Sequence, residues 1–143
     1  MENKNTMELK LPGISVNEGF ARSVVGAFAT QLNPTLEEIA DIKTAVSEAV
    51  TNAIVHAYPK SPGEIHISAA LEGRAITVVI TDFGIGISDI LAARQPFYST
   101  SKDDSRSGMG FTVMETFMDG VNVISTPGKG TSVELIKKIG QQG

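Results

Sequence analysis

The sequence contains no cysteine, which removes disulfides, thiolate zinc sites and cysteine nucleophiles from consideration. It also contains no apolar run approaching the roughly 20 residues that are needed to span a bilayer. The first residues lack the apolar core of a signal peptide. We therefore expect a cytoplasmic protein without membrane segments.

A surplus of basic residues is also missing, because 12 lysines and arginines face 16 aspartates and glutamates, for a net charge of -4. Neutralising the phosphates of a nucleic acid requires the opposite balance. The partners are therefore expected to be proteins or small molecules and not nucleic acid. A chain of 143 residues with 41% hydrophobic residues can bury the core of one compact domain, and we expect a single domain over residues 1–143.

Two widespread nucleotide-binding signatures are absent. No Gly-x-x-x-x-Gly-Lys-Ser/Thr string occurs in the sequence, which excludes a P-loop. No strand is followed by Gly-x-Gly-x-x-Gly, the fingerprint of dinucleotide-binding folds. A nucleotide site in this chain would have to be of another kind.

Hydrophobic periodicity predicts an α+β fold. Two helices are expected after the capping boxes Ser15/Glu18 and Thr35/Glu38, the second ending near Tyr58-Pro59. The remaining pattern predicts strands at 7–11, 65–71 and 75–81, a lid at 88–107, a helix at 111–118 ended by Gly120, and two strands around 127–130. This order indicates one mostly antiparallel sheet covered by helices.

Polar side chains interrupt the apolar pattern of the second predicted helix. Glu48, Asn52 and His56 are spaced four residues apart, so an α-helix would place them on one face. Such a triplet is often only a solvated edge. Alternatively, Glu48 is a general base and the amide oxygen of Asn52 ligates magnesium, which prefers hard oxygen donors.

An acid and two glycines follow the strand at 75–81, in the order Asp82-Phe-Gly84-Ile-Gly86. This segment could be no more than a turn. In a nucleotide site, Asp82 would accept a hydrogen bond from the exocyclic amine of adenine, and the glycines would let the backbone approach the flat base. Guanine presents a carbonyl at that position and would be disfavoured.

Two further glycine segments could contact a nucleotide. Arg106-Ser-Gly108-Met-Gly110 joins the predicted lid to the next helix, and a glycine-rich helix start suits phosphate binding through backbone amides. Arg106 would add a guanidinium, although a surface arginine is an equally simple interpretation. Gly128-Lys-Gly130-Thr131 reads most simply as a hairpin turn, and the hydroxyl of Thr131 could still reach a nucleotide.

The order of these segments is more specific than any one of them. Glu-x-x-x-Asn on a helix, Asp-x-Gly-x-Gly after a strand, a lid, Gly-x-Gly and then Gly-x-Gly-Thr resemble the N, G1, G2 and G3 boxes of the GHKL ATPases. The match runs from Glu48 to Thr131. The resemblance implies the two-layer α/β sandwich of the Bergerat type, with ATP or ADP and Mg²⁺ as ligands.

Within that superfamily, the chain resembles the sporulation anti-sigma F factors in the stretches Glu38–Lys43, Ser47–His56 and Arg106–Glu115. This resemblance implies a homodimeric serine kinase that inhibits sigma F in the ATP state and phosphorylates an anti-anti-sigma factor. It assigns Glu48 as the base, Asn52 to magnesium and Arg22 to partner contacts. The family positions for nucleotide are Asn52, Asp82, Gly84, Gly86, Arg106, Gly108, Gly110 and Thr131.

Two other functions share part of this pattern. A histidine kinase catalytic domain contains the same boxes but needs a histidine-bearing dimerisation hairpin, for which the sequence before the first helix has no room. A binding module would use nucleotide only to set its shape. Such a module has no need of an acid beside the metal ligand, so Glu48 discriminates between these interpretations.

Overall fold

A computed structural model describes residues 4–57, 63–86 and 110–140. Over these residues it contains five strands and three α-helices, together with a 3₁₀ turn at Thr30–Leu32 and a π-helical turn at Ala53–Ala57. In chain order the strands and α-helices are β1 (Lys4–Pro12), α1 (Val16–Ala29), α2 (Leu36–Asn52), β2 (Glu64–Glu72), β3 (Ala75–Asp82), α4 (Gly110–Phe117), β4 (Gly120–Thr126) and β5 (Gly130–Lys138).

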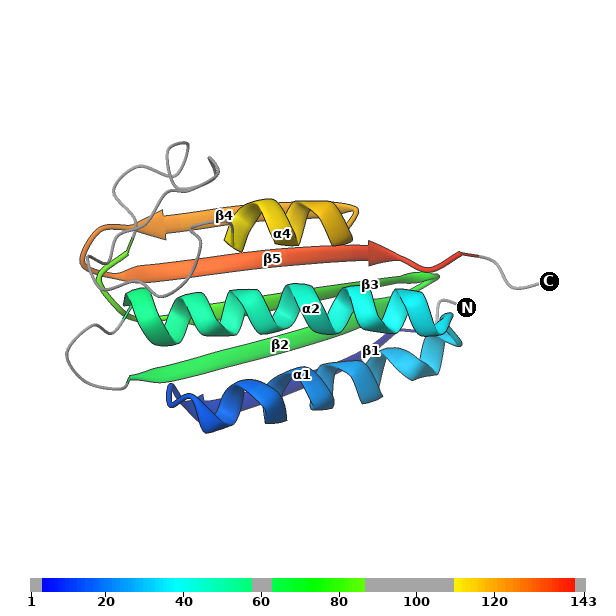
Figure 1. The fold of residues 1–143 in the computed structure, drawn as a ribbon, viewed down its shortest axis with the longest axis horizontal. Helices are drawn as coiled ribbons and strands as arrows, with labels where there is room; N and C mark the ends of the chain where they lie inside the picture. The colour runs from blue at the N-terminus through cyan, green and yellow to red at the C-terminus, as the bar shows by residue number, and fades with distance from the viewer. Residues whose placement is uncertain (1–3, 58–62, 87–109, 141–143) are drawn as a thin grey trace.

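The strands form one antiparallel sheet in the order β1-β2-β3-β5-β4. All three α-helices lie on the same face of the sheet, as Figure 1 shows, and the other face is left without a covering layer of described residues. The two-layer α+β fold predicted from the sequence is therefore confirmed. The predicted first strand is longer than expected, since it pairs with β2 from Lys4 to Pro12.

The core lies between the sheet and the helices. Alternate residues of β2 and β3 are buried, which places Ile65, Ile67, Ile76 and Ile80 beneath the helices and leaves their neighbours on the open face. Lys137 ties the two layers together, since its Nζ donates to the carbonyl oxygen of Phe117 at 2.7 Å and to Asp41 at 3.2 Å. A cation at the C-terminal end of α4 also suits the helix dipole.

The predicted start of the first helix is partly wrong. Ser15 precedes α1, but its side chain makes no capping hydrogen bond. The backbone of Ser15 is already helical, and Glu18 pairs with Arg22 at 3.0 Å. The second predicted capping box is confirmed, because Thr35 and Glu38 exchange both hydrogen bonds at the start of α2.

The apolar side chains of α1 are only partly buried. Val16 is 75% exposed and Phe20 is 52% exposed, whereas the buried face consists of smaller residues, namely Ala21, Val25, Gly26 and Ala29. Small residues allow α1 to pack closely on its neighbours. Of the larger apolar side chains, Val16 and Phe20 are left on the surface, whereas Phe28 packs partly buried against the core.

No helix in the three described ranges is long and apolar enough to cross a membrane. The predicted lid at 88–107, the helix end at Tyr58-Pro59, and the site residues Arg106 and Gly108 lie outside these ranges.

Candidate nucleotide site

The predicted nucleotide-site residues that the structure describes gather at one end of the sheet. In Figure 1, the C-terminal ends of α2 and β3, the N-terminal ends of α4 and β5, and the C-terminal end of β4 all lie at that end. Asp82 is the last residue of β3 and pairs in register with Thr131 on β5. The fold therefore brings together segments that are separated by up to about half of the chain.

Asp82 is a buried carboxylate, only 7% exposed, on the helix-covered face of the sheet. Its Oδ1 accepts hydrogen bonds from the backbone N–H groups of Gly84 at 3.0 Å and Thr131 at 3.2 Å. Burial raises the pKa of Asp82, and these two hydrogen bonds oppose that rise. A donor arriving from a ligand would further stabilise the charged form.

The next residue, Phe83, points to the opposite face. Its ring meets the ring of His66 edge-on, with the ring centroids 4.8 Å apart. Strand geometry sends successive side chains to opposite faces, so the Asp82 side chain is directed to the helix layer while Phe83 leaves it. The aromatic contact fixes one side of the turn that carries Asp82.

The two glycine turns interlock through their backbones. A Cβ atom added at Gly86 would collide with the carbonyl oxygen of Thr126, and one at Gly130 would collide with that of Asp82. Both glycines have positive φ, +77° and +123°, where other residues are strained. Gly128 N–H donates to the carbonyl oxygen of Ile85 at 2.7 Å. The turn after Asp82 is thus held against the β4–β5 turn.

Glu48 and Asn52 lie one helical turn apart near the end of α2, and both side chains are half-buried. The Oε2 atom of Glu48 is buried. Asn52 abuts the start of α4, because a Cβ atom at Gly110 would be 2.8 Å from its Nδ2 and 3.2 Å from its Oδ1. Glycine at 110 therefore makes room for the amide that the sequence assigns to metal binding.

Glu48, Asn52 and His56 were predicted to share one face of an α-helix, but the α-helix extends only to Asn52. From Ala53 to Ala57 the backbone is π-helical, so the α-helical spacing that led to His56 ends there, and the side chain of His56 is outside the described part. Short π-helical segments inside helices are frequent at functional sites. The sequence pattern gave no indication of this turn.

The donor set fits a magnesium ion that also binds phosphate oxygens. Mg²⁺ commonly takes one or two protein oxygens and completes its shell with water and substrate phosphates. The amide oxygen of Asn52 is a hard oxygen donor of the type that Mg²⁺ prefers. Over the described ranges no three acidic or histidine side chains gather into a group that could hold a metal ion.

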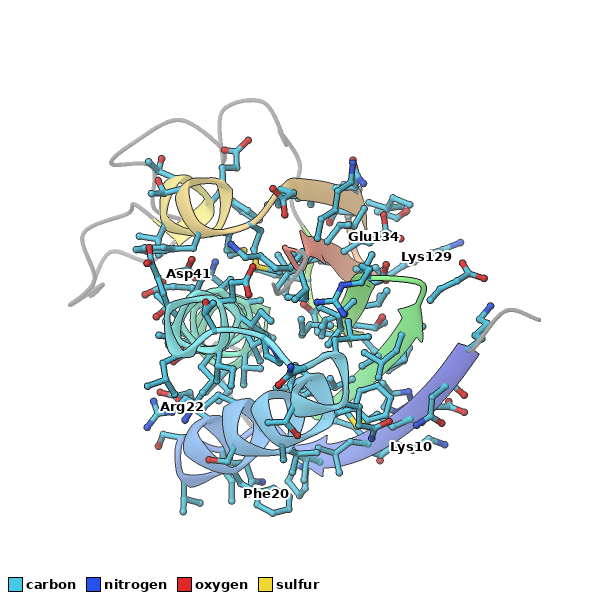
Figure 2. The ribbon with its side chains drawn as sticks, turned by 90° about the vertical axis from the view of Figure 1, so that its right-hand side faces the viewer. Lys10, Phe20, Arg22, Asp41, Lys129 and Glu134 are labelled. Carbon is cyan, nitrogen blue, oxygen red and sulfur yellow. The ribbon has the colours of Figure 1, made fainter. Side chains whose placement is uncertain are left out.

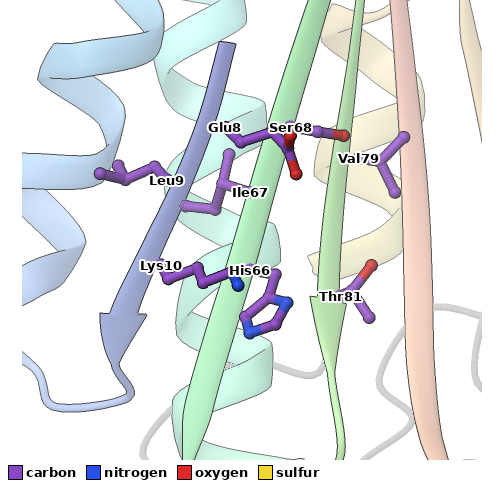
Figure 3. A pocket seen from close by; sticks show the side chains of 8 residues that line it. All are labelled: Glu8, Leu9, Lys10, His66, Ile67, Ser68, Val79 and Thr81. Atoms are coloured by element: carbon purple, nitrogen blue, oxygen red, sulfur yellow. The ribbon is translucent and has the colours of Figure 1, made fainter.

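A separate hollow of about 210 Å³ lies on the open face of the sheet. Figure 3 shows that Glu8, Lys10, His66, Ser68 and Thr81 project toward it from β1, β2 and β3. None of the predicted site residues within the described ranges lines it. It faces away from the helices and is therefore distinct from the site at the end of α2.

Sequence reasoning missed Ser125 on β4. Its Oγ lies 2.7 Å from Oγ1 of Thr131 and 3.1 Å from the carbonyl oxygen of Gly130. The two hydroxyls meet because Ser125 and Thr131 are register partners. Counting outward from the predicted turn at Pro127–Gly130 pairs Thr131 with Thr126, whereas the observed three-residue connection at 127–129 pairs Thr131 with Ser125.

Comparison with known proteins agrees with this geometry. Residues 15–137 match the histidine kinase-like ATPase domain. The chain belongs to this family. The predicted GHKL resemblance is thereby confirmed, and membership places the chain among the nucleotide-binding, kinase-type ATPases.

Relatives within the histidine kinase-like ATPase family match nearly the whole chain. The anti-sigma F factor of Thermoanaerobacter sp. (strain X514) is 58% identical over 140 residues, which are 98% of this chain and 98% of that protein. The anti-sigma F factor of Anoxybacillus flavithermus is 51% identical over 137 residues, 95% of this chain and 94% of that protein. The predicted resemblance to anti-sigma F factors is therefore also confirmed.

Solved structures share the fold. The RsbU and RsbW domains of a Mycobacterium tuberculosis protein superimpose with a TM-score of 0.71 at 20% identity, covering 96% of this chain and 33% of that chain. The histidine kinase domain of a blue-light activated kinase from Erythrobacter litoralis gives 0.53 at 16% identity, covering 85% and 61%. At these identities the likeness concerns the fold alone.

Proposed function

We propose that the chain is an ATP-dependent serine protein kinase that also binds and inhibits the sporulation sigma F factor, with an anti-anti-sigma factor as its phosphate acceptor. The observation that carries this proposal is the similarity to proteins named anti-sigma F factor over nearly the full length of both chains. The geometry at the end of α2 provides a chemical basis for it.

Asp82 recognises the base in this proposal. Its buried carboxylate is held in place by two backbone donors, so it can accept a hydrogen bond from the exocyclic amine of adenine without reorganising. A hydrogen bond to a charged group contributes about 1.5 to 3 kcal/mol. Gly84 and Gly86 keep the neighbouring backbone free of side chains where the base would lie.

Glu48 and Asn52 act at the other end of the nucleotide. Asn52 would hold Mg²⁺, which when bound supplies neutralising charge to the phosphates. Glu48 lies one helical turn earlier on α2 and takes the proton of the substrate serine. The serine oxygen then bonds to the terminal phosphorus while the bond from that phosphorus to ADP breaks.

The phosphates would lie at the start of α4. Gly110 is the first residue of that helix and contacts Asn52, and the N-terminus of a helix attracts anions. Arg106 and Gly108 complete the phosphate contacts in this proposal. Phosphoryl transfer relies mainly on such positioning and charge neutralisation.

Two surfaces are proposed for protein partners. Strand β1 is an edge of the sheet, and α1 beside it exposes Val16 and Phe20, a combination suited to pairing two copies of the chain. Arg22 projects from a different side of α1 than Phe20, as Figure 2 shows. We assign Arg22 to contacts with the sigma factor and the anti-anti-sigma factor.

The test is incubation of the protein with Mg²⁺, radiolabelled ATP and a purified anti-anti-sigma factor. Label on a serine of that partner supports a protein kinase. Release of inorganic phosphate alone would indicate a hydrolase, and absence of both would indicate a binding module. Either of these two results contradicts the proposal.

The assigned base is tested with Glu48→Gln, which keeps the shape of the side chain but cannot accept the proton. We expect phosphotransfer to fall by about 100- to 10,000-fold, with ATP binding retained. Glu37→Gln is the matched control, since Glu37 is an exposed acid in the first turn of the same helix. Unchanged phosphotransfer by Glu48→Gln would refute the role of Glu48.

A further inference from the structure

The hydroxyl groups of Ser125 and Thr131 form a short chain at the base end of the site. Thr131 is 8% exposed, and its backbone N–H donates to Asp82 at 3.2 Å. Its hydroxyl oxygen lies 2.7 Å from that of Ser125. Ser125 Oγ also donates to the carbonyl oxygen of Gly130 at 3.1 Å. This series of hydrogen bonds connects Ser125 on β4, through Thr131, to the Asp82 carboxylate that is proposed to bind the base.

The number of protons on the two hydroxyls indicates which of them donates the hydrogen bond between Ser125 and Thr131. A serine hydroxyl has one proton to donate and two lone pairs. The carbonyl oxygen of Gly130 can only accept, so the hydrogen bond between it and Ser125 Oγ uses the Ser125 proton. By distance alone either hydroxyl can be the donor to the other, but when the Ser125 proton is given to Gly130 this hydrogen bond runs from Thr131 to Ser125. The Thr131 hydroxyl can then accept a hydrogen bond from a ligand but has no proton left to donate to one.

We infer that Ser125 is a positioning residue that fixes the Thr131 hydroxyl as a hydrogen-bond acceptor and thereby favours adenine over guanine. Asp82 and Thr131 then both present acceptors at the same end of the site. Such a surface matches the exocyclic amine of adenine, either directly or through a water molecule. It opposes the carbonyl oxygen of guanine. This inference rests on the proposed nucleotide site.

Removing the Ser125 hydroxyl would release the Thr131 proton. In Ser125→Ala, Thr131 can turn and donate to a ligand, so the penalty on guanine should fall while one indirect contact to adenine is lost. A neutral hydrogen bond contributes about 0.5 to 1.5 kcal/mol, which corresponds to roughly a two- to tenfold change in affinity. We expect the ratio of GTP to ATP dissociation constants to fall by that factor.

The open face of the same sheet offers a matched control. Thr81 and Ser132 form an equivalent hydroxyl pair at 3.0 Å, one residue further along β5 and on the opposite face. Thr81 lines the hollow of Figure 3. Ser132→Ala therefore removes the same chemical group from the neighbouring strand β5, on the face away from the site, and it should leave the nucleotide ratio unchanged.

The experiment is isothermal titration of ATP and GTP into wild type, Ser125→Ala, Ser125→Thr and Ser132→Ala. The inference expects a lower GTP-to-ATP ratio in Ser125→Ala alone, with Ser125→Thr restoring the wild-type value. An unchanged ratio in Ser125→Ala, or an equal loss for both nucleotides, would overturn it.

A double variant adds a readout that a purely structural role would not move. In a Thr131→Val background the Ser125→Ala change should no longer alter the ratio, because the hydroxyl that Ser125 orients is gone. A further change in that background would also overturn the inference. Wild type that binds no ATP would reject the proposed nucleotide site itself, whereas binding with unaltered selectivity in Ser125→Ala rejects only the role of Ser125.

Discussion

Asp82 carries an energetic cost in the free protein. Its carboxylate is buried, and burial raises its pKa despite two backbone donors. A carboxyl group whose pKa is raised on folding favours the folded state below the unfolded pKa, and this contribution is lost as pH rises through the folded pKa. Above its folded pKa the charged side chain therefore disfavours the folded, ligand-free protein.

Asp82→Asn should therefore separate binding from stability. The amide keeps an oxygen for the Gly84 and Thr131 N–H groups but carries no buried charge. We expect ATP affinity to fall by about ten- to a hundredfold, while the melting temperature at pH 7 to 8 is equal to or above that of wild type. The stability difference should narrow as pH falls toward the ordinary aspartate value of 3.8.

Titration calorimetry and thermal denaturation over a pH series measure both quantities. An Asp82→Asn variant that melts well below wild type at neutral pH would mean that the carboxylate is chiefly structural. Unaltered ATP affinity would show that it does not read the base.

Among the elements, α2 is joined at its start to Gly140, which follows β5 and Ile139, by the side chain of Glu38. One carboxylate oxygen of Glu38 accepts from the N–H of Thr35, and the other accepts from the N–H of Gly140, both at 2.9 Å. These backbone donors lower the pKa of Glu38, with that of Gly140 the larger cause. The helix that carries Glu48 and Asn52 is thus tied to the chain just after β5.

Glu38→Gln should destabilise the protein by about 0.5 to 1.5 kcal/mol at neutral pH, since an amide has only one oxygen for two N–H donors. Because the pKa of Glu38 is lowered on folding, its contribution is present above the unfolded pKa and is lost as pH falls through the folded pKa. The difference between variant and wild type should accordingly shrink below about pH 4.5.

Urea denaturation at several pH values measures this difference. The control is Glu37→Gln, which removes the same charge from the same first turn, and we expect it to cost only a few tenths of a kcal/mol. Equal losses in the two variants would mean that charge at the helix start, and not the two hydrogen bonds of Glu38, accounts for the stabilisation.

These two helix starts show what sequence could and could not predict. Thr35 and Glu38 cap α2 as expected, because the signal lies within four residues and nothing competes with it. Ser15 and Glu18 have the same spacing, but Glu18 pairs with Arg22 instead. The fold class was predicted from hydrophobic periodicity, and the candidate site residues were found from short motifs, both of which are local sequence signals. Ser125 depends on hairpin register, and the π-helical turn and the buried face of α1 depend on packing between elements.

At the scale of the whole molecule, α1 and β1 lie on a side of the protein that contributes no residue to the proposed nucleotide site. Val16 and Phe20 expose apolar surface on α1, while β1 leaves one edge of the sheet unpaired among the described strands. Exposed apolar patches and open strand edges are typical of association surfaces. Partner binding can therefore be altered on α1 without touching the residues around Asp82.

Arg22→Ala should test this separation. Arg22 is 44% exposed, and its contact in the described structure is the pair with Glu18, which as a surface pair is worth about 0.2 to 1 kcal/mol. We expect the variant to fold and to bind ATP as wild type does, but to lose at least about tenfold in sigma F affinity, which is a common result of truncating an arginine at the centre of an interface.

The control is Glu18→Ala, which breaks the same ion pair and leaves Arg22 in place, so this variant should bind the sigma factor nearly as wild type does. Calorimetry with ATP and with sigma F measures both affinities. If the two variants lose sigma F binding equally, Arg22 acts only by stabilising α1, and its assignment to the partner surface is wrong.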